Sequence, residues 1–358
     1  MNTDEVYYDA ISLLKKLIST PSHSREECGA SRVVAEFLAD TVSECKICSL
    51  NNNIWVTAPG FEASRPTLML NSHIDTVKPV SGWSMPPYEP VEVDDKLYGL
   101  GSNDAGASLV SLIAVFRLLC KTVQRYNIIF AASTEEEVSG ACGMEALIKV
   151  LPPLTLGIVG EPTGMHPAVA EKGLMVLDCY VYGVSGHAAR EEGENAIYKA
   201  LPIVDKLCAY KFSRVSPELG EVKITVTQIS AGTQHNVVPD LCTFVVDIRG
   251  NGLYTNFEIL QELQNVIPKT ECELKPRSTR LNSSGIDVLN PFVKRCTMMG
   301  LVPFGSPTLS DQALIPYPTV KIGPGNSSRS HTADEYIFKS EIREAIEIYV
   351  KLLDGLKL

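Results

Sequence analysis

Apolar residues in the first half of this chain recur with two different spacings. Spacings of three and four positions predict helices, and short unbroken apolar runs predict buried strands. The predicted helices are 5–19, 25–40, 107–121 and 140–150. The predicted strands are 45–58, 66–71, 127–132 and 155–160. Because strands alternate with helices, the pattern indicates an α/β layer built on a mostly parallel sheet.

From about residue 173 the strands become longer and alternate in polarity. The predicted strands there are "LMVLDCYVYG", "EVKITVTQIS", "LCTFVVDIRG" and "ECELKP", and the predicted helices are 194–211 and "NFEILQELQNVI". Their order is βαββαβ, the ferredoxin-like α+β unit. Helix 289–299 and strand "TVKIG" then predict a return to the first domain. We therefore expect a discontinuous α/β domain at 1–172 and 283–358, with an α+β domain at 173–282 inserted into it.

Length and charge limit the classes of protein. A chain of 358 residues is long enough for two domains. The net charge is −10, with the acids scattered, which argues against nucleic acid or an anionic membrane as the main partner. We expect no membrane span, because no apolar run reaches ~18 residues. The first 19 residues are acidic and then amphipathic, which is not typical of a signal peptide.

The cysteines favour a reducing compartment. There are 10, several of them inside predicted apolar helices and strands, as in the core of a cytoplasmic protein. Cys45 and Cys48 have CxxC spacing, which also occurs in redox and zinc sites. No second CxxC exists, so we interpret this pair as part of a strand and expect a cytoplasmic protein.

Acids and histidines follow the predicted strands of the first domain. They are His73, Asp75, Glu135, Glu136, Glu137, Glu161 and His331, and Asp104 lies directly ahead of the predicted helix that starts at 107. The carboxyl ends of parallel strands form the crevice where open α/β sheets bind ligands. Carboxylates crowded there raise one another's pKa, and a dinuclear divalent metal site resolves the repulsion.

Each of these residues also has a purely structural interpretation. Asp104 precedes a predicted helix and is a residue type that caps helices. Ser133 and Glu136 have capping-box spacing. Glu161 before a proline suits a solvated turn, and His73 with Asp75 suits a surface pair. All of these alternatives would have to fall at one sheet edge by accident, which favours the metal site.

Six motifs together resemble a known enzyme family. They are "NSHIDTVKP", "YGLGSNDAG", "STEEEVSGACGM", "IVGEPT", "GVSGHAAR" and "SRSHTADEY". In this order they are similar to the zinc-dependent deacylase and peptidase family of acetylornithine deacetylase, succinyl-diaminopimelate desuccinylase, aminoacylase and glutamate carboxypeptidase. The resemblance runs from residue 10 to the C-terminus. It implies a catalytic domain with two zinc ions per subunit, where cobalt can substitute, and an inserted domain that serves as lid and dimerisation surface.

By position, the resemblance implies roles for the first motifs. His73 matches a zinc ligand that Asp75 orients, and Asp104 matches the ligand that bridges both ions. In "TEEEVSG", Glu136 matches the general base and Glu137 a ligand. A register one residue earlier, with Glu135 as base, stays open because three acids stand in a row.

The remaining motifs complete the implied site. Glu161 matches a ligand of the other zinc, and His331 completes the site on the Glu137 side. His187 matches a histidine that reaches across from the partner subunit of a homodimer to stabilise the oxyanion. Arg249 and Asn236 match positions that hold the substrate's α-carboxylate. From the residues alone, the structural alternative for His187 is a strand-end histidine satisfied by the backbone, and Arg249 could equally be an exposed strand-end residue.

The resemblance also implies a substrate class. Short length, "HIDTVKP" and "GEPT" are closest to the acetylornithine deacetylase branch, so we expect hydrolysis of N-acetyl-L-ornithine, or a succinyl or citrulline analogue, in arginine biosynthesis. The family usually has arginine where Leu100 stands and often lysine near Ala105 or Gly106, which leaves the pocket charge open. The alternatives are succinyl-diaminopimelate desuccinylase, a dipeptidase or carboxypeptidase, and a non-catalytic binding protein.

Overall fold

A computed structural model describes residues 2–190 and 192–358. The chain forms two units. Unit 1 contains the residues up to Val169 together with Gly285–Phe304 and Ser310–Leu358, and unit 2 contains Ala170–Ser284 and Gly305–Leu309. Residues 305–309 were expected in the first domain. They belong to unit 2 because, for example, the N–H of Lys172 donates to the carbonyl oxygen of Ser306 (3.0 Å).

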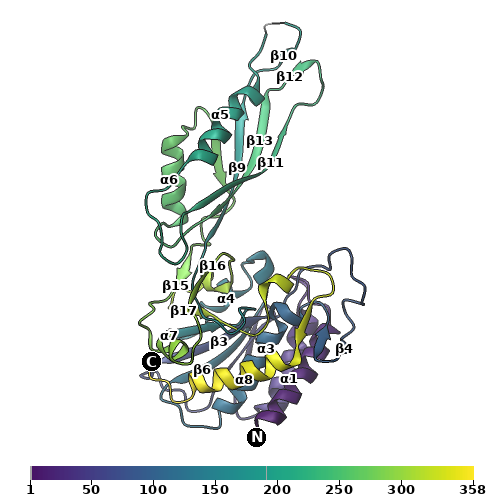
Figure 1. Ribbon diagram of the computed structural model, residues 1–358, viewed down its shortest axis with the longest axis vertical. Helices are drawn as coiled ribbons and strands as arrows, with labels where there is room; N and C mark the ends of the chain where they lie inside the picture. The colour runs from purple at the N-terminus through teal and green to yellow at the C-terminus, as the bar shows by residue number, and fades with distance from the viewer. Residues whose placement is uncertain (1, 191) are drawn as a thin grey trace. The chain divides into compact units, whose positions relative to one another are not determined.

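The central sheet of unit 1 has the order β1-β2-β6-β3-β7-β17 and continues through the short strands β8 and β15, with β16 paired to β8 (Figure 1). The bounds are β1 Lys46–Leu50, β2 Asn53–Thr57, β3 Thr67–His73, β6 Asn127–Ser133, β7 Leu156–Val159, β8 Ala168–Glu171, β15 Ser284–Gly285, β16 Phe304–Ser306 and β17 Thr319–Lys321. Strands β6, β3, β7 and β17 are parallel, which confirms the predicted mostly parallel α/β sheet. A second, three-stranded sheet contains β4 Val91–Val93, β5 Lys96–Tyr98 and β18 Tyr336–Phe338.

The prediction of one strand over 45–58 is wrong. The segment is an antiparallel hairpin in which Leu50 pairs with Asn53. Asn51 and Asn52 between them have φ values of 51° and 69°. Two consecutive residues with positive φ form the tight turn that matches the twist of paired strands, and asparagine tolerates this conformation.

Both faces of the parallel strands are buried. Leu68 and Leu70 of β3 face a core formed with α1, α2, α3 and α8, whereas Met69 faces a smaller core beside α4. Helices α1, α3 and α8 pack together on the first face (Figure 1). The helix bounds are α1 Thr3–Ile18, α2 Cys28–Thr41, α3 Ala107–Leu119, α4 Met144–Leu147, α7 Pro291–Met298 and α8 Lys339–Leu353. Coverage on both faces explains why the strands are continuous apolar runs.

Two expectations about helices need correction. The helix predicted over 140–150 is only α4, and it begins no earlier than Met144 because the chain before it is held in a tight loop. At Gly143 an added Cβ would lie 1.9 Å from the carbonyl oxygen of Thr134. Contrary to our expectation, one helical segment, Ser102–Leu119, is long and apolar enough to cross a membrane. In this structure 89% of it is buried, as in the core helix of a folded domain.

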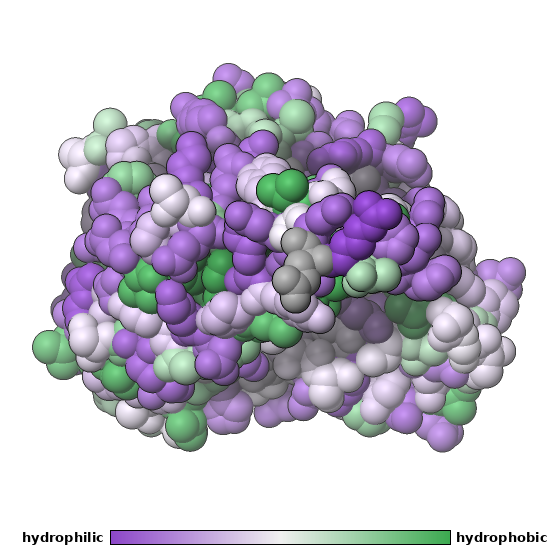
Figure 2. Space-filling view, turned by 90° about the horizontal axis from the view of Figure 1, so that it is seen from above, coloured by the Kyte–Doolittle hydropathy of each residue, from purple (hydrophilic) through white to green (hydrophobic). Residues whose placement is uncertain are grey.

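Unit 2 is built around a four-stranded antiparallel sheet of order β11-β13-β9-β14. The bounds are β9 Leu174–Tyr182, β10 Gly186–His187, α5 Ala196–Ala209, β11 Lys223–Ala231, β12 Val237–Val238, β13 Leu241–Arg249, α6 Asn256–Val266 and β14 Glu273–Pro276. Helices α5 and α6 cover one face (Figure 1), and the inward residues of β9 and β13 alternate with more exposed ones. Apart from the two-stranded β10–β12 ribbon, this is the predicted βαββαβ order. The face shown in Figure 2 is mostly hydrophilic, with small separate groups of hydrophobic side chains.

Candidate metal centre

The parallel strands bring the predicted site residues to one edge of the sheet. His73, the last residue of β3, pairs with Ser133, the last residue of β6. On the other side of β3, Asn71 pairs with Val159, so Glu161 comes level with His73 two residues later. The chain passes from β3 to its neighbour β6 on one side, and from β6 to β7 on the other side of β3, so the strand ends form the crevice expected where the strand order reverses.

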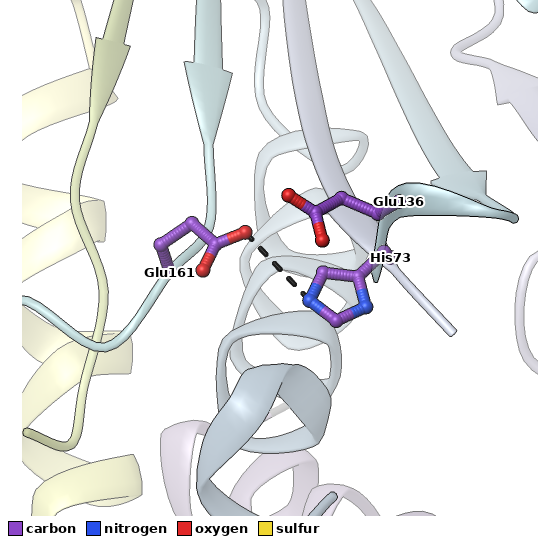
Figure 3. A group of neighbouring side chains, drawn as sticks. All are labelled: His73, Glu136 and Glu161. Atoms are coloured by element: carbon purple, nitrogen blue, oxygen red, sulfur yellow. Dashed lines mark ion pairs between the residues drawn. The ribbon is translucent and has the colours of Figure 1, made fainter. Parts of the chain in front are cut away.

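His73 is buried, and polar neighbours at both of its ring nitrogens fix the orientation of the ring. Its Nδ1 lies 2.9 Å from the backbone oxygen of Asp75, an acceptor only, so Nδ1 carries the proton and donates. Nε2 therefore faces the crevice, 3.3 Å from Asp104 Oδ1 and 3.7 Å from Glu161 Oε1. Figure 3 shows the carboxylates of Glu161 and Glu136 directed towards this ring. The imidazole is thus fixed with one nitrogen held and the other presented to carboxylates, the arrangement of a metal ligand.

Asp104 connects this histidine with a second one. Its Oδ2 lies 3.7 Å from Nε2 of His331, and the same Nε2 lies 3.0 Å from Oε2 of Glu137. His331 has a φ of 58°, an uncommon left-handed conformation for a residue with a side chain. One carboxylate therefore directs one oxygen to each histidine, as a bridging ligand does.

Asp75 organises the acidic turn after β6. Its Oδ1 accepts the backbone N–H of Glu136 (3.0 Å), and its Oδ2 accepts the backbone N–H of Glu137 (3.2 Å) and the hydroxyl of Ser24 (2.7 Å). Burial acts to raise the pKa of Asp75, but the His73 imidazole, 3.6 Å from Oδ1, and the hydrogen bonds from Ser24 and from the N–H of Glu136 outweigh it and hold the pKa below its usual range. Asp75 therefore stays charged and positions both His73 and the turn.

The structure distinguishes the three consecutive glutamates. Glu136 groups with His73 and Glu161, and Glu137 groups with His73 and Asp104, with their ligand atoms within 4.8 Å of one another. Glu135 turns away, and its Oε2 accepts the N–H of Cys142 (3.2 Å). This geometry favours the register with Glu136 and Glu137 in the crevice.

Carboxylates crowd the crevice strongly enough to hold protons. Burial raises the pKa of Glu136 well above its usual range, and the charges of Glu161 and Asp311 add to this. Burial and the charge of Asp104 raise the pKa of Glu161 to about 8. The hydrogen bond with Glu137 raises the pKa of His331 to about 9. A divalent cation supplies the positive charge that these groups otherwise obtain from protons, so two imidazoles with several carboxylates suit a metal site.

The structural alternatives for two of these residues do not hold. Asp104 makes no cap hydrogen bond to α3, which has Gly106 at its N-cap position. Ser133 does not form a capping box with Glu136, because its hydroxyl donates to Oδ2 of Asp311 (2.5 Å). Neither side chain therefore caps a helix, and both make their contacts in the crevice.

Sequence reasoning missed several residues that hold the site. Glu335 is buried, and its carboxylate accepts the backbone N–H groups of Gly101, Asn103 and Asp104 at 2.8–3.0 Å. Asp311 lies near Glu136, and Ser24 holds Asp75. The only signal for Glu335 was its position four residues after His331; the other contacts join segments far apart in the chain.

The three candidates in unit 2 do not form one cluster within that unit. His187 lies in β10 and Asn236 directly precedes β12, where the N–H of Ala188 donates to the carbonyl oxygen of Asn236 (3.0 Å). Arg249 lies at the other end of β13, and its guanidinium donates to both carboxylate oxygens of Asp247 (2.8 and 3.1 Å). Strands rise about 3.4 Å per residue, so the length of β13 separates Arg249 from the ribbon by roughly 27 Å.

Comparison with known protein families gives one assignment. The model of Peptidase family M20/M25/M40 matches residues 69–355. Among curated relatives, the succinyl-diaminopimelate desuccinylase of Delftia acidovorans is 25% identical over 97% of this chain and 98% of its own length. The desuccinylase of Shewanella pealeana is likewise 25% identical, over 97% of both chains.

Solved structures share the fold along nearly the whole chain. The aminopeptidase PepT of Bacillus cereus has a TM-score of 0.78 at 19% identity and covers 99% of this chain and 98% of its own. The YXEP protein of Bacillus subtilis, a dinuclear metal binding peptidase, has a TM-score of 0.76 at 17% identity and covers 99% and 100%. At such identities the likeness concerns the fold.

Proposed function

Since the chain belongs to peptidase family M20/M25/M40 and is a hydrolase of that family, we propose that it is a metal-dependent amidohydrolase acting on N-acyl amino acids. The observation that carries the proposal is Asp104 between His73 and His331, with Glu137 and Glu161 at the outer sides. These five side chains are the ligands expected from the sequence, and they suit two zinc ions, with cobalt as a substitute.

Each chain group then has a distinct task. A bound divalent metal supplies Lewis acidity towards water and the amide carbonyl. Glu136, which lies beside the ligands, takes the proton of the attacking water and passes it to the departing nitrogen. Asp75 holds Glu136 and His73 in register through its carboxylate and backbone oxygen.

For the substrate, the relatives favour the desuccinylase alternative over the acetylornithine deacetylase of our sequence analysis. Succinyl-diaminopimelate desuccinylases are the named relatives, at 25% identity. We therefore place N-succinyl diamino acids first and N-acetyl-L-ornithine second, the latter supported by the "HIDTVKP" and "GEPT" motifs. Peptides come third.

One panel assay tests both class and substrate. Protein loaded with zinc or cobalt is incubated with N-succinyl-LL-diaminopimelate, N-succinyl-L-ornithine, N-acetyl-L-ornithine, N-acetyl-L-citrulline, a dipeptide and a tripeptide, and free amine is measured. We expect the highest kcat/KM for one N-acyl amino acid and background rates after chelation. Turnover of the peptides alone would show that the substrates are peptides rather than N-acyl amino acids. Background rates on every substrate of the panel would favour a non-catalytic binding protein.

We also propose a cytoplasmic homodimer joined through unit 2. His187 and Asn236 lie too far from Arg249 in one unit 2 to contact the same small ligand, so two copies would be needed to combine them. Strand β11 is an open sheet edge with Ile229 exposed, and α5 exposes Tyr198 and Leu201. Open edges and exposed apolar side chains are typical of surfaces covered by a second copy. Sedimentation should give twice the chain mass, and Ile229→Lys should shift it towards the monomer.

The free cysteines support the proposed compartment. All 10 cysteines are free in the structure. A chain with this many unpaired thiols suits a reducing compartment. Fractionation of cells expressing the protein would test this location directly.

A further inference from the structure

The turn that follows β6 is held by side chains from distant segments. Four consecutive backbone N–H groups donate to side-chain oxygens: Thr134 to Asn53 Oδ1 (3.0 Å), Glu135 to Glu27 Oε1 (3.2 Å), Glu136 to Asp75 Oδ1 (3.0 Å) and Glu137 to Asp75 Oδ2 (3.2 Å). Glu135 has a left-handed φ of 54°, so the segment is not a continuous helix or strand, and its buried donors need acceptors from elsewhere in the chain. The three acceptors therefore replace the hydrogen bonds that a regular helix or strand would supply.

Glu27 and Asn53 are acceptors without a catalytic or metal role, and Glu27 is the charged one of the two. It is 1% exposed, and its Oε1 also accepts the N–H of Arg25 (2.6 Å) while Oε2 accepts an amide N–H of Asn52 (3.4 Å). It stands at the N-cap position of α2, where Ser, Thr, Asp or Asn ordinarily caps the helix, and its side chain makes no cap hydrogen bond. Its carboxylate is directed at the turn instead.

We propose that Glu27 is a positioning residue, which sets the Glu136 carboxylate by holding Glu135 in its left-handed conformation. Glu135 is the residue at which the chain turns from β6 into the segment that carries Glu136 and Glu137. If its N–H loses the buried acceptor, the peptide plane is free to rotate, and the rotation displaces the adjacent residue Glu136. The inference rests on the proposed function, in which Glu136 is the base.

Two substitutions of Glu27 separate the effect of side-chain length from the effect of charge. Glu27→Gln keeps the length and one acceptor oxygen but removes the charge, and the amide of Asn52 can turn to accept from the new NH₂ group. Glu27→Asp keeps the charge but withdraws the oxygens by one methylene, so the contact with Glu135 is lost. Both retain a buried polar group, so both are milder than Glu27→Ala, which leaves the donors of the turn unsatisfied.

The control is Asn127→Ala, at the other end of the same strand. Asn127 is also buried, accepts the N–H of Glu62 (3.0 Å) and donates to the carbonyl oxygens of Glu62 and Arg65. Its loss should lower the denaturation midpoint and leave kcat per metal-loaded chain unchanged. This control shows what a loss of stability alone does to the rate.

For Glu27→Asp we expect kcat per metal-loaded chain to fall about 10- to 100-fold, because small misplacements of catalytic groups have effects of this size. KM and metal content should stay within about threefold of the wild type, since a base acts on the rate rather than on binding. Glu27→Gln should keep kcat within about threefold of the wild type for the same geometric reason. A loss of stability alone would not leave kcat higher in Glu27→Gln than in Glu27→Asp.

Amide hydrogen exchange of the peptide containing 134–137 supplies a readout without activity. In metal-free protein, exchange should become at least about tenfold faster in Glu27→Asp and stay near the wild-type rate in Glu27→Gln, because the acceptor is lost only in the former. The inference would be overturned if Glu27→Gln and Glu27→Asp had equal kcat values and equal amide exchange rates, or if kcat were lower in Glu27→Gln than in Glu27→Asp. Background activity of the wild type on the whole panel would instead refute the proposed function, and exchange would still decide whether Glu27 holds the turn.

Discussion

Replacing Asp75 by asparagine tests how much one carboxylate holds together. Asp75 is 1% exposed and accepts hydrogen bonds from the N–H groups of Glu136 and Glu137 and from the hydroxyl of Ser24. Asparagine has one acceptor oxygen. If that oxygen faces Glu136, the new NH₂ group faces the N–H of Glu137, and two donors then oppose each other in a buried position. The serine hydroxyl can turn to accept, but the backbone N–H cannot.

A buried donor without a partner reduces stability by about 1–3 kcal/mol, and loss of a charged acceptor adds to this, so we expect about 2–4 kcal/mol in total. Because the same contacts position the proposed base, kcat should fall about 10²-fold as well. Urea denaturation followed by fluorescence measures the first effect, and steady-state kinetics on the best panel substrate measures the second. A change below about 0.5 kcal/mol with kcat within twofold would refute this account of Asp75.

Asp334→Asn is the matched control for this substitution. Asp334 accepts the same three kinds of hydrogen bond, from the N–H groups of Ser84 and Met85 and from the Ser84 hydroxyl, but the two contacts with Ser84 are exposed to solvent and the one with Met85 is only partly buried. Water can replace what the amide fails to accept there, so this variant should lose much less stability. Equal losses in the two variants would show that burial does not determine the effect.

Three further outcomes are expected. Glu136→Gln should reduce kcat about 10²- to 10⁴-fold with metal content retained. The kcat of the neighbouring Glu135→Gln variant should stay close to that of the wild type. Loss of metal in Glu136→Gln would mean that Glu136 is a ligand and that the register is one residue earlier. In metal-free protein at pH 7, Glu161 and His331 hold protons because their pKa values are raised to about 8 and about 9. Zinc binding should therefore release protons and become tighter as the pH rises to 9, and calorimetry in two buffers of different ionisation enthalpy that finds no release would contradict this. His187→Ala should lower kcat more than it raises KM, and an unchanged rate would remove His187 from the mechanism.

Much of the architecture followed from local patterns. Parallel strands buried on both faces must be continuous apolar runs, so β3, β6 and β7 were visible in the sequence. The predicted ligands also met, because each follows a strand or a loop that ends at the same edge of one sheet. Where local patterns failed, a turn was the cause: Asn51 and Asn52 divide one predicted strand into a hairpin, and Gly143 shortens a predicted helix to one turn.

The sequence by itself determined which residue types were available and at which strand ends they would stand, because the period of a strand and its polarity are local properties. Only the tertiary structure decided which glutamate of three enters the crevice, since the orientation of Glu135 depends on Glu27 and Asn53, more than 80 residues away. It also decided that Arg249 lies far from Asn236, because a strand that joins two residues in sequence holds them at its opposite ends. Contacts between distant segments leave no periodic pattern along the chain, so only the folded structure shows them.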